Sequence, residues 1–148
     1  MTGRKELIER LQKTAHRMRV HILNMTFAAN SGHPGGSMSA ADIVAALYFH
    51  QMRHDPKNPK GPDRDRFVLS KGHCTPVLYA ALAEAGYIPV EELKTFRQVD
   101  SRLQGHPNLL KCPGVEASTG TLGQGLSMAV GMALAGKLDQ KPYKVYCM

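Results

Sequence analysis

The stretch DRFVLSKGH, residues Asp65–His73, leads from a predicted strand towards a predicted helix, and the fold depends on this transition. Its run Phe67–Leu69 is short, apolar and bounded by turn residues, which predicts a buried β-strand. A glycine and His73 follow, and Thr75–Pro76 predicts a helix start, with threonine as N-cap and proline at the first helical position. Gly86 is placed to end that helix. The stretch therefore predicts a strand, a loop and a helix in succession.

Further helices are predicted before and after this stretch. Across residues 6–30, apolar or small side chains recur every three or four positions, which is the spacing of a long amphipathic helix. A second helix is expected over Ala40–His50, with Ser39 as N-cap and Asp42 completing a variant of the capping box. Its inward-facing residues are expected to be Ile43, Leu47 and Tyr48. A short helix is expected over Val90–Val99.

The last third of the chain predicts a helix rich in small residues and then a strand. Every fourth residue of Gly123–Lys137 on one line is small, namely Gly123, Ser127, Gly131 and Ala135. Glycine costs a helix about 1 kcal/mol relative to alanine, so this line suggests that another backbone approaches that face. Tight helix packing without a ligand explains the line equally well. The segment Tyr143–Met148 has strand character.

Composition limits the classes of protein to which the chain can belong. Its 148 residues suffice for one domain, and 43% of them are apolar, as a globular core requires. The formal net charge of +7 permits anionic partners, but tryptophan is absent and the basic residues are dispersed, which argues against nucleic acid. Neither a membrane-spanning stretch nor a secretory or transit signal is evident, so we expect a soluble, cytoplasmic protein without a membrane partner.

The three cysteines, Cys74, Cys112 and Cys147, lie far apart and form no C-x-x-C pair. An odd number at such spacing argues against a disulfide framework or a zinc ribbon. We therefore expect reduced thiols, two of them packed.

Three of the seven histidines directly follow glycine: Gly32-His33, Gly72-His73 and Gly105-His106. This number exceeds chance for a chain with 14 glycines, and it indicates turns that glycine makes easily. Pro34 and Pro107 disfavour the α region for the histidine that precedes each of them. These histidines therefore lose little conformational entropy when they bind a ligand. We interpret the three as presented side chains, and the other four histidines as structural.

The residues around these imidazoles argue against one kind of site and favour another. H-x-x-x-H and H-x-H spacings and a supporting carboxylate are missing around them, which argues against a zinc site. Histidine, with an ordinary pKa of about 6.5, can donate to an oxyanion or hydroxyl and shuttle a proton at neutral pH. Polyhydroxylated, phosphorylated ligands suit that chemistry. The loop Ser118–Gly125 also bares backbone amides near a helix N-terminus, a weak signal for an anion.

Taken together, Ser31–Gly35, Asp65–His73, Gly105–Pro107 and Thr119–Gly125 resemble the N-terminal part of transketolases. Four motifs in the family's order make the resemblance specific, and it covers nearly the whole chain. It implies an α/β thiamine diphosphate-binding fold, with a parallel sheet flanked by helices, incomplete in this chain and helix-rich. Residues 1–148 would be the N-terminal portion of the domain that binds the cofactor's diphosphate.

The resemblance also implies roles for single residues. His73 would bind the diphosphate, whereas His33 and His106 would be catalytic, contacting hydroxyls of the donor sugar and assisting proton transfer. Gly120 and Leu122 would line the aminopyrimidine and the thiazolium. The implied reaction, that of the pentose phosphate pathway, transfers a two-carbon ketol unit from a ketose phosphate to an aldose phosphate.

The chain departs from the family pattern in two places. Thr121 stands where many relatives carry proline or serine, which we expect to be tolerated. The chain ends at Tyr146–Met148, whereas the family's strand continues into a Gly-Asp-Gly motif that binds Mg²⁺ or Ca²⁺; these ligands are expected beyond Met148, and no metal ligand is expected within the chain. The glutamate that activates the aminopyrimidine belongs to the family's second domain.

We therefore expect the isolated chain to be inactive, as a truncated product or one piece of a split enzyme. Its expected partners are the remaining transketolase domains or a C-terminal subunit, in a homodimer or heterotetramer. Three alternatives stay open: a non-catalytic binding module or pseudoenzyme of the same fold; a deoxyxylulose-phosphate synthase, which shares the Ser-Gly-His opening but fits the other motifs less well; and a basic nucleic-acid binder.

Overall fold

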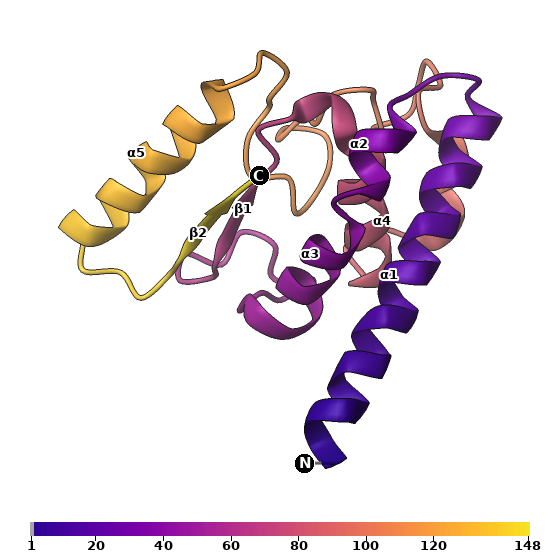
Figure 1. The fold of residues 1–148 in the computed structure, drawn as a ribbon. Helices are drawn as coiled ribbons and strands as arrows, with labels where there is room; N and C mark the ends of the chain where they lie inside the picture. Colours follow the sequence, from indigo (N-terminus) through magenta and orange to yellow (C-terminus); the bar gives the residue numbers. More distant parts are fainter. Residues whose placement is uncertain (1) are drawn as a thin grey trace.

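The computed structural model describes residues 2–148 and is helix-rich (Figure 1). In chain order the elements are α1 (Thr2–Ala28), α2 (Pro34–Met38), α3 (Ala41–Ala46), the π-helical turn η1 (Leu47–Gln51), β1 (Arg66–Val68), the 3-10 turn η2 (Gly72–Cys74), α4 (Thr75–Glu84), the 3-10 segment η3 (Val90–Thr95), α5 (Gln124–Leu138) and β2 (Val145–Cys147). None of the helices within residues 2–148 combines the length and the apolar character that crossing a bilayer demands.

The two strands pair in parallel, with Phe67 opposite Tyr146. Helix α5 lies on one side of the pair, and α1, α3 and α4 lie on the other (Figure 1). Because successive side chains of a strand point to opposite faces, Phe67 and Tyr146 join the core around α4, while Val68 and Val145 pack with residues of α5. This is the expected α/β arrangement, a small parallel sheet flanked by helices.

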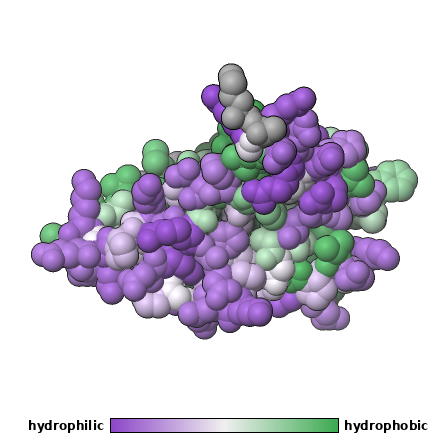
Figure 2. Space-filling model, turned by 90° about the horizontal axis from the view of Figure 1, so that it is seen from below, coloured by the Kyte–Doolittle hydropathy of each residue, from purple (hydrophilic) through white to green (hydrophobic). Residues whose placement is uncertain are grey.

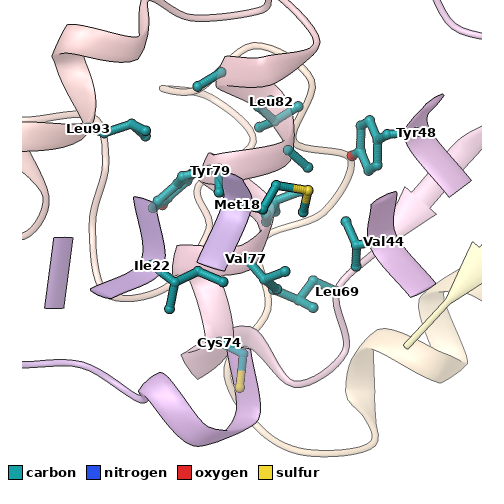
Figure 3. Close-up of a cluster of buried hydrophobic side chains, with 14 of the residues drawn as sticks. Met18, Ile22, Val44, Tyr48, Leu69, Cys74, Val77, Tyr79, Leu82 and Leu93 are labelled. Carbon is teal, nitrogen blue, oxygen red and sulfur yellow. The ribbon is translucent and has the colours of Figure 1, made fainter. Parts of the chain in front are cut away.

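The larger core surrounds α4. Nine of the ten α4 residues are buried. Met18 and Ile22 from α1, Val44 from α3 and Leu93 from η3 pack around this helix (Figure 3). The predicted stripe of the first helix is confirmed at its centre, where Met18 and Ile22 are fully buried. Close packing here makes α4 the element against which the loops before and after it are positioned.

Two predicted helix caps are wrong. The Ser39 hydroxyl donates to the carbonyl of Gly36 and caps no helix, because α2, which the sequence did not predict, ends immediately before it. Asp42 pairs with Arg19 of α1, so it takes no part in a capping box. Thr75 is the first residue of α4 rather than its N-cap, because the η2 turn leads directly into the helix.

Some of the other local predictions are confirmed and others are wrong. Gly86 ends α4 with a φ of +86°, as expected. Ile43 is 53% exposed, so its predicted inward position is wrong. The helix expected over Val90–Val99 is a 3-10 segment that stops at Thr95, because Phe96 leaves the helical region with ψ near 126°. The prediction of two packed cysteines is confirmed, since Cys74 and Cys112 are buried and Cys147 is exposed.

The small residues of α5 behave differently from the prediction. The line through Gly131 is exposed, and no described residue beyond the adjacent backbone of the helix lies within 4 Å of a Cβ built there. Close approach occurs on another face, where a Cβ at Gly125 would lie 2.6 Å from Ser70 Cα and one at Gly136 would lie 2.8 Å from the Tyr143 ring. Large apolar side chains of α5 are exposed as well. At the left of Figure 2, the side on which α5 lies in Figure 1, hydrophobic residues interrupt a mostly hydrophilic surface.

Candidate functional site

The three Gly-His loops come together. His33 directly precedes α2, and His73 lies in η2 directly before α4. Their rings meet edge to face, with centroids 4.9 Å apart. The His106 ring lies beside Gly120, where an added Cβ would sit 3.3 Å from His106 Cδ2. Segments more than 70 positions apart in sequence thus place three imidazoles in one neighbourhood.

The loop of Thr119 and Gly120 is docked on the segment that follows β1. A Cβ at Gly72 would lie 2.4 Å from the Thr119 carbonyl oxygen, so only glycine permits this approach. The Thr119 hydroxyl donates to the carbonyl of Leu69 at 2.6 Å. The glycine before His73 therefore brings the loop of Gly120 against the imidazole cluster.

Helix α2 is docked on the same segment. A Cβ at Gly36 would lie 2.5 Å from Cys74 Sγ, and Lys71 Nζ donates to the Gly36 carbonyl at 2.9 Å. The Ser37 hydroxyl donates to the His33 carbonyl at 2.9 Å, which fixes the backbone that carries this imidazole. These contacts hold His33 over η2.

The His106 loop is anchored on α4. The Thr75 hydroxyl donates to the Gly105 carbonyl at 3.2 Å, and the Tyr79 hydroxyl donates to the Gln104 carbonyl at 2.9 Å. Both donors are buried residues of α4. The helix in the centre of the core thereby determines where His106 lies.

The site is electropositive. Burial lowers the pKa of the His73 imidazole, and the positive charges of His33, His106 and Lys71 lower it further. A neutral imidazole at physiological pH can donate one hydrogen bond and accept another. In addition, α4 begins at Thr75, two residues after His73, and Gly125 in the first turn of α5 lies against Ser70. Two helix N-termini therefore add partial positive charge, which favours an anion.

Four of the residues proposed from the sequence lie together in the structure, namely His33, His73, His106 and Gly120. Of the three histidines, His33 and His106 are exposed and His73 is half-buried. Leu122 follows in the loop before α5 and is 70% exposed. Within residues 2–148, no cluster of three or more His, Cys, Asp or Glu side chains is arranged to hold a metal ion.

Sequence reasoning missed two cations of this region. Lys71 stands in the quoted SKGH motif, where its charge beside a predicted anion-binding histidine was a usable signal. Arg97 donates from Nη1 to the Ser31 hydroxyl at 3.0 Å and adopts a φ of +62°. Nothing in the sequence around Arg97 indicates this backbone conformation or this partner.

These features define the class of the protein: an α/β domain whose glycine-anchored imidazoles and lysine form a cationic cluster of the kind that suits an anionic ligand. The family model described as "Transketolase, thiamine diphosphate binding domain" matches residues 11–145. The chain therefore belongs to the transketolase family, of which it represents the N-terminal, thiamine diphosphate-binding part.

Individual relatives agree with this assignment. Transketolase of Mus musculus is 48% identical over 145 residues, which cover 97% of this chain and 23% of that protein. The 6-deoxy-6-sulfo-D-fructose transketolase subunit SqwG of Clostridium sp. (strain MSTE9) is 47% identical over 136 residues, 92% of this chain and 50% of the subunit. The crystal structure of transketolase from Campylobacter jejuni matches with a TM-score of 0.88 and 43% identity, over 93% of this chain and 23% of that one. The chain thus spans about a quarter of these transketolases and half of SqwG.

Proposed function

We propose that this chain is the diphosphate-side part of a transketolase, which transfers a two-carbon ketol unit from a ketose phosphate to an aldose phosphate. The observation that carries the proposal is the convergence of three imidazoles from three separate Gly-His loops. A histidine that only stabilises the fold does not require two further imidazoles beside it, and here burial, His33 and His106 together lower the pKa of His73. Binding and proton transfer benefit from several imidazoles at one place.

The residues present fit thiamine diphosphate. We assign the diphosphate to His73, supported by Lys71 and by the N-termini of α4 and α5, because these groups supply hydrogen-bond donors and positive charge. Gly120 and Leu122 are assigned to the aminopyrimidine and the thiazolium. When bound, the cofactor supplies the electron sink for cleavage of a carbon–carbon bond, while the protein supplies orientation and proton donors.

His33 and His106 are assigned to the donor sugar. Both are exposed at the cluster, so their ring nitrogens are free to donate to ligand hydroxyls. An imidazole nitrogen within hydrogen-bond reach of a ligand hydroxyl can donate or accept a proton there. These two residues would orient the sugar and move protons to and from its hydroxyl oxygens.

Other parts of the proposed enzyme lie outside this chain. We assign the ligands of a bridging Mg²⁺ or Ca²⁺, and the groups that hold the aminopyrimidine from its other side, to the remaining transketolase domains or to a C-terminal subunit. The complete assembly would be a homodimer or heterotetramer that serves cytoplasmic sugar phosphate metabolism. Residues 1–148 alone are accordingly expected to be inactive, because a diphosphate without its metal is held by too little positive charge.

A binding experiment tests the cofactor assignment. Thiamine diphosphate is titrated, with Mg²⁺, into the complete transketolase that carries these residues and into its His73→Ala variant, with binding followed by calorimetry and by the ³¹P resonances of the diphosphate. Loss of a hydrogen bond to a charged group costs about 1.5 kcal/mol, so we expect the Kd to rise about tenfold. His16→Ala is the matched control, because His16 is exposed on α1. Equal affinity for the two variants would contradict the assignment.

Turnover tests the completeness of the site. A coupled ketol-transfer assay with thiamine diphosphate and Mg²⁺ is expected to show no activity for residues 1–148 alone and to show activity after assembly with the remaining domains. Turnover by the isolated chain would contradict the proposal that essential groups lie elsewhere, and an inactive assembly that binds the cofactor would favour a non-catalytic binding module.

A further inference from the structure

Two adjacent residues lie between the His33 loop and the His106 loop. Phe96 is buried, and its ring lies 3.5 Å from where a Cβ of Gly32 would be. Arg97 donates from Nη1 to the Ser31 hydroxyl at 3.0 Å. The segment that follows η3 thereby supports the backbone just before His33 through two contacts.

The same arginine contacts the other loop. A Cβ built on Gly105 would lie 2.6 Å from Arg97 Nη2, 2.7 Å from Cζ and 2.9 Å from Nε. These distances place the plane of the guanidinium flat against the backbone of Gly105, the residue before His106. The Arg97 backbone N–H also donates to the Leu103 carbonyl at 2.9 Å. One side chain thus touches the loops of two of the three imidazoles.

Arg97 carries two local costs. Its φ of +62° lies in the left-handed region, which an arginine enters at a cost of roughly 1 kcal/mol or more. Its Nε is buried without a hydrogen-bond partner among residues 2–148, although native proteins leave few such groups unpaired. Strain and an unpaired donor at one residue beside a site indicate that the position of the side chain is maintained for a reason other than stability.

We propose that Arg97 is a positioning residue, which holds the His33 loop and the His106 loop in register by bridging Ser31 and Gly105. It acts through the two histidines and touches neither cofactor nor substrate in this role. The inference rests on the proposed function insofar as those histidines bind the donor sugar, but the bridge itself is a property of the chain and can be tested without a ligand.

The first test is structural. In NMR spectra of the histidine-labelled chain, wild-type protein should show a nuclear Overhauser effect between the His33 and His73 rings, whose centroids are 4.9 Å apart, and a second between His106 and Gly120. Arg97→Gln should weaken at least one of them, because the loops lose their common support. Arg102→Gln is the matched control: it removes a neighbouring arginine that pairs with Glu92, so it should leave both effects unchanged. Unchanged effects in Arg97→Gln would overturn the proposal.

The second test is kinetic and uses the assembled enzyme. A displacement of about 1 Å at a reacting group can cost on the order of 100-fold, so Arg97→Gln should lower kcat/KM for the ketose by about 10- to 100-fold. The Kd for thiamine diphosphate should change by less than about twofold, because His73 and Lys71 keep their contacts. A general loss of stability would not produce this split. An Arg97→Gln enzyme with kcat/KM no lower than that of Arg102→Gln would overturn the proposal.

Gly105 gives a reciprocal variant. Its φ lies outside the left-handed region, so Gly105→Ala adds no backbone strain, but the new methyl group would displace the guanidinium. Gly105→Ala should therefore reproduce the kinetic effect of Arg97→Gln. The double variant should lose no more activity than either single variant, because the effects of two substitutions that remove the same interaction do not add. Additive losses would count against a shared bridge. Failure of cofactor binding would refute the proposed function and leave the NMR result on Arg97 standing.

Discussion

Helices α4 and α5 are both apolar, and the chain buries them very differently. In α4, nine of ten residues are buried, including Tyr79 and Leu82 at 0% exposure. In α5, only Gly125, Ala129 and Gly136 of fifteen residues are buried, and Leu134 is 55% exposed. An apolar helical sequence therefore does not determine burial. What determines it is whether surfaces on all sides of the helix belong to the same chain.

The largest expected effect compares the same substitution in the two helices. Leu82→Ala should lower the free energy of unfolding by about 3 kcal/mol, because it leaves a cavity in a closely packed core. Leu134→Ala should change it by less than about 0.5 kcal/mol, because that side chain is half exposed already. Urea denaturation followed by circular dichroism measures both. Similar losses for the two variants would show that α5 is as firmly packed as α4.

A smaller effect concerns Asp65, which joins the two regions at the start of the sheet. Burial opposes ionisation of its carboxyl group, but hydrogen bonds from the backbone N–H groups of Arg53 and Lys144 outweigh it and hold the pKa below the usual value. A carboxylate with a lowered folded pKa contributes stability above its unfolded pKa of about 4, and this contribution is lost as the pH falls through the folded pKa.

Asp65→Asn should therefore cost about 1.5 kcal/mol near pH 7 and flatten the decline in stability below about pH 5. Asp63→Asn serves as control, since Asp63 forms an exposed ion pair with Lys141, and exposed pairs contribute less than about 1 kcal/mol. Denaturation curves at several pH values measure the difference. A wild-type slope in Asp65→Asn would refute this role of the carboxylate.

The smallest expected effect compares two glycines within α5, one exposed and one buried. Gly131→Ala should raise the free energy of unfolding by about 1 kcal/mol, because alanine favours the helix and nothing within 4 Å obstructs its methyl group. Gly125→Ala should be destabilising, because its Cβ would collide with the backbone of Ser70. Thermal unfolding distinguishes the two. Destabilisation by Gly131→Ala would mean that the exposed face is occupied in solution.

The elements that the sequence predicted well are those with a strong local signal. The first helix has a regular apolar stripe, and Gly86 ends α4 through a left-handed conformation that glycine adopts at no cost. The errors arose where a neighbouring element overrides local preference. Ser39 is an excellent N-cap by residue type, yet it directly follows the last residue of α2. Ile43 follows the period of its helix but reaches solvent.

For the candidate site, sequence reasoning found the histidines because glycine and proline restrict the backbone around each of them. It could not identify the contacts that hold the histidine loops in place. Tyr79 and Thr75 anchor the His106 loop through hydrogen bonds 25 and 30 positions along the chain, and Arg97 reaches Ser31 across 66. Such contacts depend on tertiary packing, which no local pattern encodes.

The parallel pairing of β1 with β2 has a consequence for how the chain folds. Asp65, directly before β1, and Lys144, directly before β2, are bonded across 79 positions, so the pair closes a loop of more than half the chain. Closure entropy must be overcome before such non-local contacts contribute, which makes them slow to form. We expect α1, α3 and α4 to assemble early, with the sheet completed last as a distinct late step in refolding.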